Sequence, residues 1–223
     1  MVLGSFNPAI FHPQWFKASE LLNPEECEAA DNVVLTKDLA SFHLPWCRVQ
    51  SFNDRFSVET TDSARIITLS DLVVGTFNLL EHCPITSTGF SRFFHVQLES
   101  EMKTNKIWDL LSPKAMWEEV IPSPRTNTIS IEGENKEEKG IYQALHAKIE
   151  PSARVEHGVF FEVHQRYTIS SNNRSLNDSE IQHLYGEGHL LRQKIQDDWI
   201  DFLSKSESIT NHLLKKFRES LSE

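Results

Sequence analysis

The sequence predicts an α+β fold: a single domain over residues 1–223 in which helices cover a mainly antiparallel or mixed sheet. Three observations lead to this class. Some stretches alternate apolar and polar residues, which is typical of strands, and others repeat apolar residues at helical spacing. Strands and helices do not alternate strictly, which disfavours a parallel βαβ sheet. A chain of 223 residues, 39% of them apolar, can bury one sizeable core.

Residues 1–22 are expected to form an apolar N-terminal arm. Pro8 and Pro13 prevent a long regular element there, while several aromatic side chains supply apolar surface to bury. The segment Asn23–Glu26 then combines an N-cap residue, a proline at the first helical position and acidic residues in the first turn. We therefore expect an arm that docks on the core or on a partner, followed by a short helix.

The middle of the chain mixes predicted strands and helices. Residues 33–60 alternate in the manner of strands, and Asn53-Asp54 is a turn signal that indicates a hairpin. Residues 66–80 repeat apolar side chains at helical spacing and are predicted to form a core helix. Residues 85–98 are expected to be extended, and residues 103–120 to form two short helices separated by a proline.

Residues 141–150 and 159–169 form the clearest pair of predicted strands, and we expect an antiparallel hairpin. Matching the apolar faces of the two strands requires that the numbers of opposite residues add up to an even value. A register in which they add up to 310 meets this condition. A C-terminal helical segment is predicted over residues 176–223. Two glycines, Gly186 and Gly188, indicate that its continuous part starts near His189.

Charge, cysteine content and the length of apolar runs disfavour several classes of protein. The formal charge is -10 and the basic residues are scattered, so nucleic acid is an unlikely partner. The three cysteines are far apart, which predicts free thiols rather than a metal or redox pair. No apolar run approaches the ~20 residues of a membrane span and no signal segment is visible, so we expect a cytoplasmic protein without membrane contact.

Common catalytic signatures do not occur in the sequence. It contains no phosphate-binding P-loop, no dinucleotide-binding glycine motif, no zinc-protease HExxH motif and no GxSxG nucleophile motif. We therefore expect neither a cofactor nor a bound metal, although a site built from distant residues would escape such a search.

The predicted late hairpin carries the most interesting polar cluster. Its register places His146 opposite His164 and Lys148 opposite Glu162, with Arg166 nearby on the same face. Two imidazoles beside a carboxylate can bind a metal or pass protons. The alternative interpretation is a solvent-facing polar strand surface, and both interpretations stay open.

Arg92 and His95 form a second candidate, in a predicted strand with aromatic residues on both faces. The planar guanidinium of Arg92 can anchor a carboxylate or phosphate, with His95 on the opposite face unless a bulge intervenes. Alternatively, Arg92 is a structural ion-pair partner and His95 a core residue with its hydrogen bonds satisfied.

Aromatic residues near the two ends of the chain are candidates for an interface. Aromatic side chains are core material first, but they are also enriched at protein interfaces. The candidates are Phe11, Trp15, Phe16, Trp199 and Phe202.

Several short stretches spread over nearly the whole chain carry a family resemblance. They are Phe6-Asn7-Pro8 with Trp15-Phe16, Asp54-Arg55-Phe56, Asp71–Phe77, Phe94-His95, Glu150-Pro151-Ser152 and Gly158-Val159-Phe160. Through them the chain resembles an uncharacterised bacterial family of similar length. The resemblance implies a bacterial, single-domain protein and carries over no catalytic role.

We expect a non-enzymatic protein-protein interaction module, either a homo-oligomer or an accessory subunit of a bacterial complex. The alternative is an enzyme or small-ligand-binding protein with a polar site on one sheet face. A third hypothesis, nucleic-acid binding, would need a local basic patch formed by Arg48, Arg55, Arg92 and Lys148.

Overall fold

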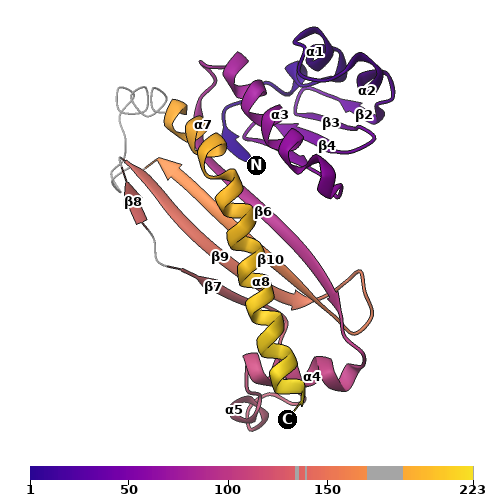
Figure 1. Ribbon diagram of the computed structural model, residues 1–223, viewed down its shortest axis with the longest axis vertical. Helices are drawn as coiled ribbons and strands as arrows, with labels where there is room; N and C mark the ends of the chain where they lie inside the picture. The colour runs from indigo at the N-terminus through magenta and orange to yellow at the C-terminus, as the bar shows by residue number, and fades with distance from the viewer. Residues whose placement is uncertain (134–135, 139, 170–187, 223) are drawn as a thin grey trace. The chain divides into compact units, whose positions relative to one another are not determined.

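The computed structural model describes residues 1–133, 136–138, 140–169 and 188–222, which include ten β-strands (Figure 1). The predicted class is confirmed, since antiparallel strands combine with helices and the chain ends in a helix. The chain divides into two compact units. The first contains Met1–Phe90, Lys136–Gln143 and Arg166–Trp199, and the second contains the rest. That the chain forms one domain stays a prediction.

The first unit is built on an antiparallel sheet with the strand order β2-β3-β4-β5-β1-β6. In this order the strands are β2 (Asp31–Leu35), β3 (Leu39–His43), β4 (Arg48–Phe52), β5 (Arg55–Glu59), β1 (Val2–Gly4) and the first part of β6 (Ile85–Gln97). The predicted hairpin is confirmed, because β4 and β5 flank the turn at Asn53-Asp54 and Val49 pairs with Val58. In addition, β8 (Lys136–Glu138) pairs with the start of β9 (Ile141–Pro151).

The N-terminal arm and helix α3 (Ile66–Leu79) supply the aromatic core of the first unit. The arm folds into the 3-10 helix η1 (Pro8–Ile10) and helix α1 (Pro13–Ala18), and each begins at a proline because the first helical position needs no N–H donor. The ring of Phe77 on α3 packs on Phe56 of β5 at 5.3 Å between centroids. The helix predicted after Asn23 is α2 (Pro24–Glu28), with a capping box between Asn23 and Glu26.

The predicted C-terminal helix is two helices in the described residues, α7 (Gly188–Asp197) and α8 (Trp199–Ser222). The prediction of one continuous helix from near His189 is therefore wrong. The two helices meet at Asp198, whose carboxylate accepts a hydrogen bond from the Tyr167 hydroxyl at 2.6 Å and pairs with Lys194. The part of the predicted segment at 176–187, including Gly186, lies outside the described residues.

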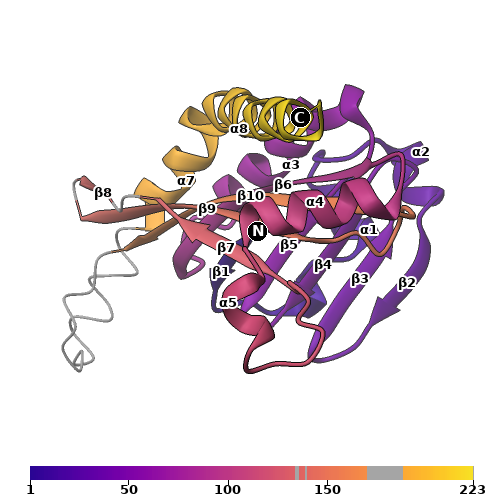
Figure 2. The same cartoon turned by 90° about the horizontal axis from the view of Figure 1, so that it is seen from below.

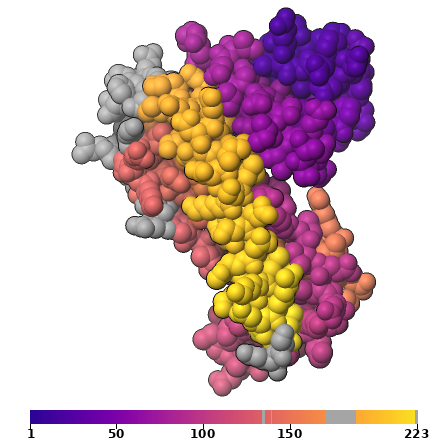
Figure 3. All heavy atoms as spheres, in the orientation of Figure 1, coloured from indigo at the N-terminus to yellow at the C-terminus, as the bar shows by residue number. Residues whose placement is uncertain are grey.

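The second unit is a sheet with the strand order β6-β10-β9-β7, where β10 is Gly158–Ile169 and β7 is Ile129–Glu132. Helix α8 runs along one face of these strands (Figures 1 and 2), and its side chains cover that face in Figure 3. The core under the helix contains Ile107, Trp108, Ile149, Val159, Phe161 and Phe217. In the second unit, the odd-numbered residues Ile149 of β9 and Val159 and Phe161 of β10 therefore point toward α8.

Two short helices follow β6, as predicted. Helix α4 (Glu101–Leu111) starts at Ser100, whose hydroxyl accepts a hydrogen bond from the Lys103 amide at 3.3 Å. Pro113 separates it from α5 (Ala115–Glu118). Throughout the part of the chain that the structure describes, no helix has both the length and the hydropathy needed to cross a bilayer.

Candidate functional site

One face of the second-unit sheet, opposite to α8, contains most of the polar residues that the sequence predicted for a site. Successive side chains of a strand point to opposite faces, so the face away from α8 takes the even-numbered residues of β7, β9 and β10 and the odd-numbered residues of β6. We call this surface the open sheet face. It consists of Ser91, Phe93, His95, Thr128, Ser130, Glu132, His146, Lys148, Glu150, Phe160, Glu162 and His164.

A row of polar side chains crosses four strands of the open sheet face. Glu132 pairs with His146 in the β7-β9 register, and its carboxylate lies 3.8 Å from Nδ1 of that histidine. The rings of His146 and His164 are 6.1 Å apart, and Nδ1 of His164 lies 2.8 Å from the Ser91 hydroxyl. The structure thus places His146 beside His164, as the predicted hairpin register requires.

The two histidines alone do not make a complete metal site. A protein-bound zinc ion typically has three or four protein ligands. Among the described residues, no group of three or more His, Cys, Asp or Glu side chains is arranged to hold a metal ion. The row is better described as a polar surface with imidazole and hydroxyl groups that can accept or donate hydrogen bonds.

The next row is organised around Lys148. Its ammonium group lies 2.9 Å from Glu150 and 3.9 Å from Glu162, so the predicted pairing of Lys148 with Glu162 is present. The hydrogen bond from Lys148 lowers the pKa of the Glu150 carboxyl, and a second hydrogen bond from Thr128 acts in the same direction. These two hydrogen bonds favour the ionised form of the Glu150 carboxyl.

Aromatic rings occupy the β6 side of the open sheet face. Phe93 is 53% exposed and its ring stacks on Phe160 with 5.9 Å between centroids and an angle of 20°. His95 packs on the same Phe160 ring at 4.9 Å, and its Nδ1 lies 2.9 Å from the Ser152 hydroxyl. The expectation that His95 is a core residue is wrong, because its strand position turns it to the open sheet face, where it is only half-buried.

Arg92 lies on the opposite face of β6 and contacts α8. Its Nη1 donates a hydrogen bond to the Leu203 carbonyl at 3.0 Å and lies 3.6 Å from the Glu207 carboxylate. The ion-pair interpretation of Arg92 agrees with these contacts, and the strand alternation separates Arg92 from the histidine row. Arg166, the remaining candidate, is exposed on β10 and belongs to the first unit.

The interface candidates pack within their own units. Phe11, Phe16 and Phe202 are almost completely buried, so they serve the core rather than an open surface. Trp15 and Trp199 are half-buried, and their rings contact Phe16 at 4.9 Å and Phe90 at 5.1 Å respectively. The sequence shows that these residues are aromatic, but whether each side chain is buried depends on the segments that pack around it.

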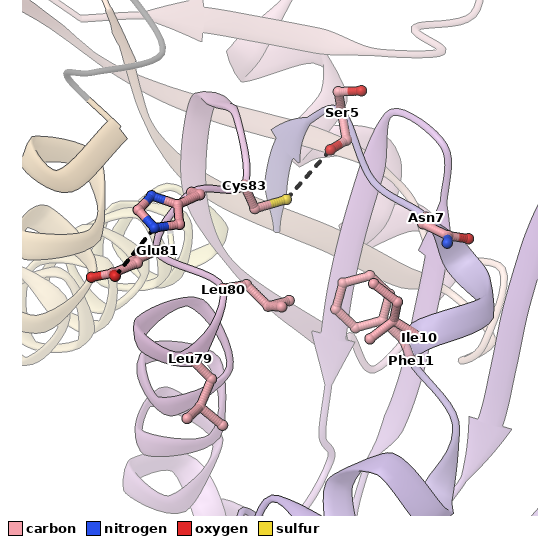
Figure 4. A pocket seen from close by; sticks show the side chains of 9 residues that line it. Ser5, Asn7, Ile10, Phe11, Leu79, Leu80, Glu81 and Cys83 are labelled. Carbon is pink, nitrogen blue, oxygen red and sulfur yellow. Dashed lines mark hydrogen bonds and ion pairs between the residues drawn. The ribbon is translucent and has the colours of Figure 1, made fainter.

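The first unit contains a hollow with a volume of about 340 Å³ that no sequence pattern indicated. Its lining is mostly apolar and includes Ile10, Phe11 and Leu80 (Figure 4). The Cys83 thiol points to the Ser5 carbonyl at 3.3 Å. Burial raises the pKa of the Cys83 thiol, which disfavours the thiolate that nucleophilic chemistry needs.

An exposed apolar patch in the second unit was also missed by sequence reasoning. It consists of Met116, Trp117, Val120 and Ile121, which are 72%, 47%, 71% and 46% exposed. The apolar spacing in this region predicted two short helices but not the exposure of these side chains, since spacing alone does not reveal what lies opposite. We call these four residues the apolar patch.

Comparisons of the chain with protein-family models, with curated proteins and with solved structures gave no match. The resemblance to a bacterial family of similar length therefore stays a prediction.

Proposed function

We propose that this chain is a protein-protein interaction module that associates through its apolar patch. The observation that carries the proposal is the exposure of Met116, Trp117, Val120 and Ile121 within one short segment. Scattered apolar residues on a surface need no explanation, but apolar side chains gathered in one place mark interaction sites. Tryptophan and methionine are also enriched in interfaces, and tryptophan often contributes most to binding.

Local structure presents the patch on a defined scaffold. The amides of Trp117 and Glu118 donate hydrogen bonds to the Lys114 carbonyl at 2.7 and 3.2 Å, and the Ile121 amide donates to the Trp117 carbonyl at 2.8 Å. The Lys114 ammonium pairs with Asp109 of α4 at 2.7 Å, which ties the start of α5 to the preceding helix. An ordered patch binds with a smaller entropy cost than a mobile one.

Self-association is the first form of this function to test, because an apolar patch can bury itself against a second copy around a two-fold axis. Sedimentation velocity of the wild type between ~1 and ~100 µM should show an increase in mass with concentration. Trp117→Ser should weaken association at least ~10-fold, since loss of a central interface tryptophan costs about 2 kcal/mol or more.

Ile67→Ser is the matched control. Ile67 is 50% exposed but lies on α3 in the first unit, so this variant should associate like the wild type. A wild type that stays monomeric over the whole range, or association unaffected by Trp117→Ser, would contradict the proposal.

A second candidate function is binding of a small polar ligand at the histidine row. It is favoured by the 6.1 Å separation of the His146 and His164 rings and by the hydrogen bond between His164 and Ser91. The test is a thermal-shift screen of anionic metabolites and zinc chloride. A stabilising compound whose effect is lost in His146→Ala and His164→Ala would support it, and a screen without any such compound would reject it.

A further inference from the structure

We propose that the open sheet face binds a basic peptide segment of a partner protein by stacking an arginine side chain on Phe93 and pairing it with Glu162. The proposal goes beyond the apolar patch, which lies on a different element of the same unit. It depends on the order of side chains across β6 and β10, on the charge of the face and on the exposure of its aromatic rings.

The order of side chains follows from two contacts. Ser91 meets His164 at 2.8 Å, and His95 meets Phe160 at 4.9 Å between ring centroids. Because β6 and β10 run antiparallel, Phe93 lies opposite Glu162 between these two pairs. Neighbouring strands are about 4.8 Å apart, so one planar group lying on the Phe93 ring can also reach the Glu162 carboxylate.

The charge of the open sheet face favours a cationic partner. Among the residues named above for the open sheet face, all in the second unit, Glu132, Glu150 and Glu162 oppose one cation, Lys148, which leaves two net negative charges when the histidines are neutral. The whole chain carries a formal charge of -10, so its long-range field also attracts basic partners. Nucleic acid fits this surface poorly, because Lys148 is already engaged by Glu150 at 2.9 Å and Glu162 at 3.9 Å.

The aromatic rings favour arginine over lysine. Phe93 is 53% exposed and stacks on Phe160 at an angle of 20°, which presents a flat ring surface to solvent. A guanidinium group stacks on aromatic faces and forms paired hydrogen bonds with a carboxylate, whereas an ammonium group is a compact and strongly hydrated charge. Arginine therefore matches both the ring and the carboxylate of this surface.

Substitutions of Lys148 and Glu162 should change peptide affinity in opposite directions. It neutralises part of the charge of Glu150 and Glu162, so it competes with an incoming arginine. Replacing it with glutamine should tighten binding of a basic peptide, while replacing Glu162 with glutamine should weaken it. A nonspecific attraction to the acidic chain would respond to charge alone and would not depend on the Phe93 ring.

The experiment is fluorescence anisotropy with a labelled peptide of alternating glycine and arginine and its lysine counterpart, at ~50 and ~150 mM salt. The arginine peptide should bind the wild type at least ~5-fold more tightly than the lysine peptide. Glu162→Gln should weaken its binding ~5-fold to ~10-fold, and Phe93→Leu, which keeps an apolar side chain without a ring, ~3-fold. Lys148→Gln should tighten it ~3-fold.

Ile67→Ser, which changes an exposed apolar residue of α3 in the first unit, is the control and should bind the arginine peptide like the wild type. Equal binding of the two peptides, or unchanged binding in both Glu162→Gln and Phe93→Leu, would overturn the proposal. Loss of peptide binding in Trp117→Ser would show that the peptide binds at the apolar patch, and this result would also overturn the proposal. Binding of labelled single-stranded RNA that Lys148→Gln abolishes would assign the open sheet face to nucleic acid instead.

Discussion

Replacing Arg92 with methionine tests whether this side chain fastens α8 to the second-unit sheet. Arg92 reaches α8 through the Leu203 carbonyl at 3.0 Å and the Glu207 carboxylate at 3.6 Å, and its guanidinium lies 4.9 Å from the centre of the Phe94 ring. Methionine keeps an unbranched apolar stem of similar reach, so the substitution removes the charge and the donors while filling much of the same space.

The expected loss of stability is about 2 kcal/mol. A hydrogen bond from a charged donor contributes about 1.5–3 kcal/mol, and a cation-π contact about 0.5–1 kcal/mol. The Glu207 side chain is 61% exposed, so its ion pair adds well under about 1 kcal/mol. The Leu203 carbonyl also accepts a hydrogen bond from the Ser206 hydroxyl at 2.8 Å, so it keeps a partner in the variant and the loss falls in the lower part of the range.

Urea unfolding followed by circular dichroism measures this loss. Arg154→Met is the matched control, because Arg154 is exposed, and its stability should stay within about 0.5 kcal/mol of the wild type. If Arg92→Met unfolds at the same urea concentration as the wild type, the contacts to α8 contribute nothing. The interpretation of Arg92 as a structural residue would then be refuted.

Two further predictions concern buried groups. Phe16→Ala should lower the free energy of unfolding by about 3–5 kcal/mol, because the ring is fully buried and packs on Phe42; stability near that of the wild type would contradict its assignment to the core. Burial raises the pKa of Cys47 to about 12 and also raises that of Cys83, so at pH 8 both remain thiols. Labelling of the two thiols with iodoacetamide, followed by mass spectrometry, should be slow and should become faster as the pH rises. Cys83 is less buried and should be labelled first, whereas rapid labelling of Cys47 at pH 8 would contradict the burial of its thiol.

Local signals explain why most elements could be predicted from the sequence. The turn at Asn53-Asp54 and the helix start at Asn23 depend on residues next to each other in the chain, so they can be read without tertiary information. The placement of His146 and His164 on one face followed from the alternation of two long strands, because a shift by one residue would turn every apolar side chain to the wrong face.

Features that depend on distant packing could not be predicted. The sequence marks Trp117 as apolar, but only the three-dimensional arrangement shows that nothing in its own unit buries it completely. His95 and Arg92 have similar neighbours in the sequence, yet α8 covers one of the two faces that they occupy. The division between α7 and α8 at Asp198, whose partner Tyr167 is 31 residues away, left no signal in the apolar spacing.

Native mass spectrometry of the purified protein tests the central claim, that the chain works through contacts with other protein chains, most directly. One spectrum reports both the number of chains in the assembly and any small molecule or metal that stays bound. The account predicts an oligomer at a whole multiple of the chain mass, without added mass, that Trp117→Ser reduces to the monomer. A monomer that carries additional mass, and whose additional mass is lost in His146→Ala with His164→Ala, would contradict the account and identify a ligand site on the open sheet face.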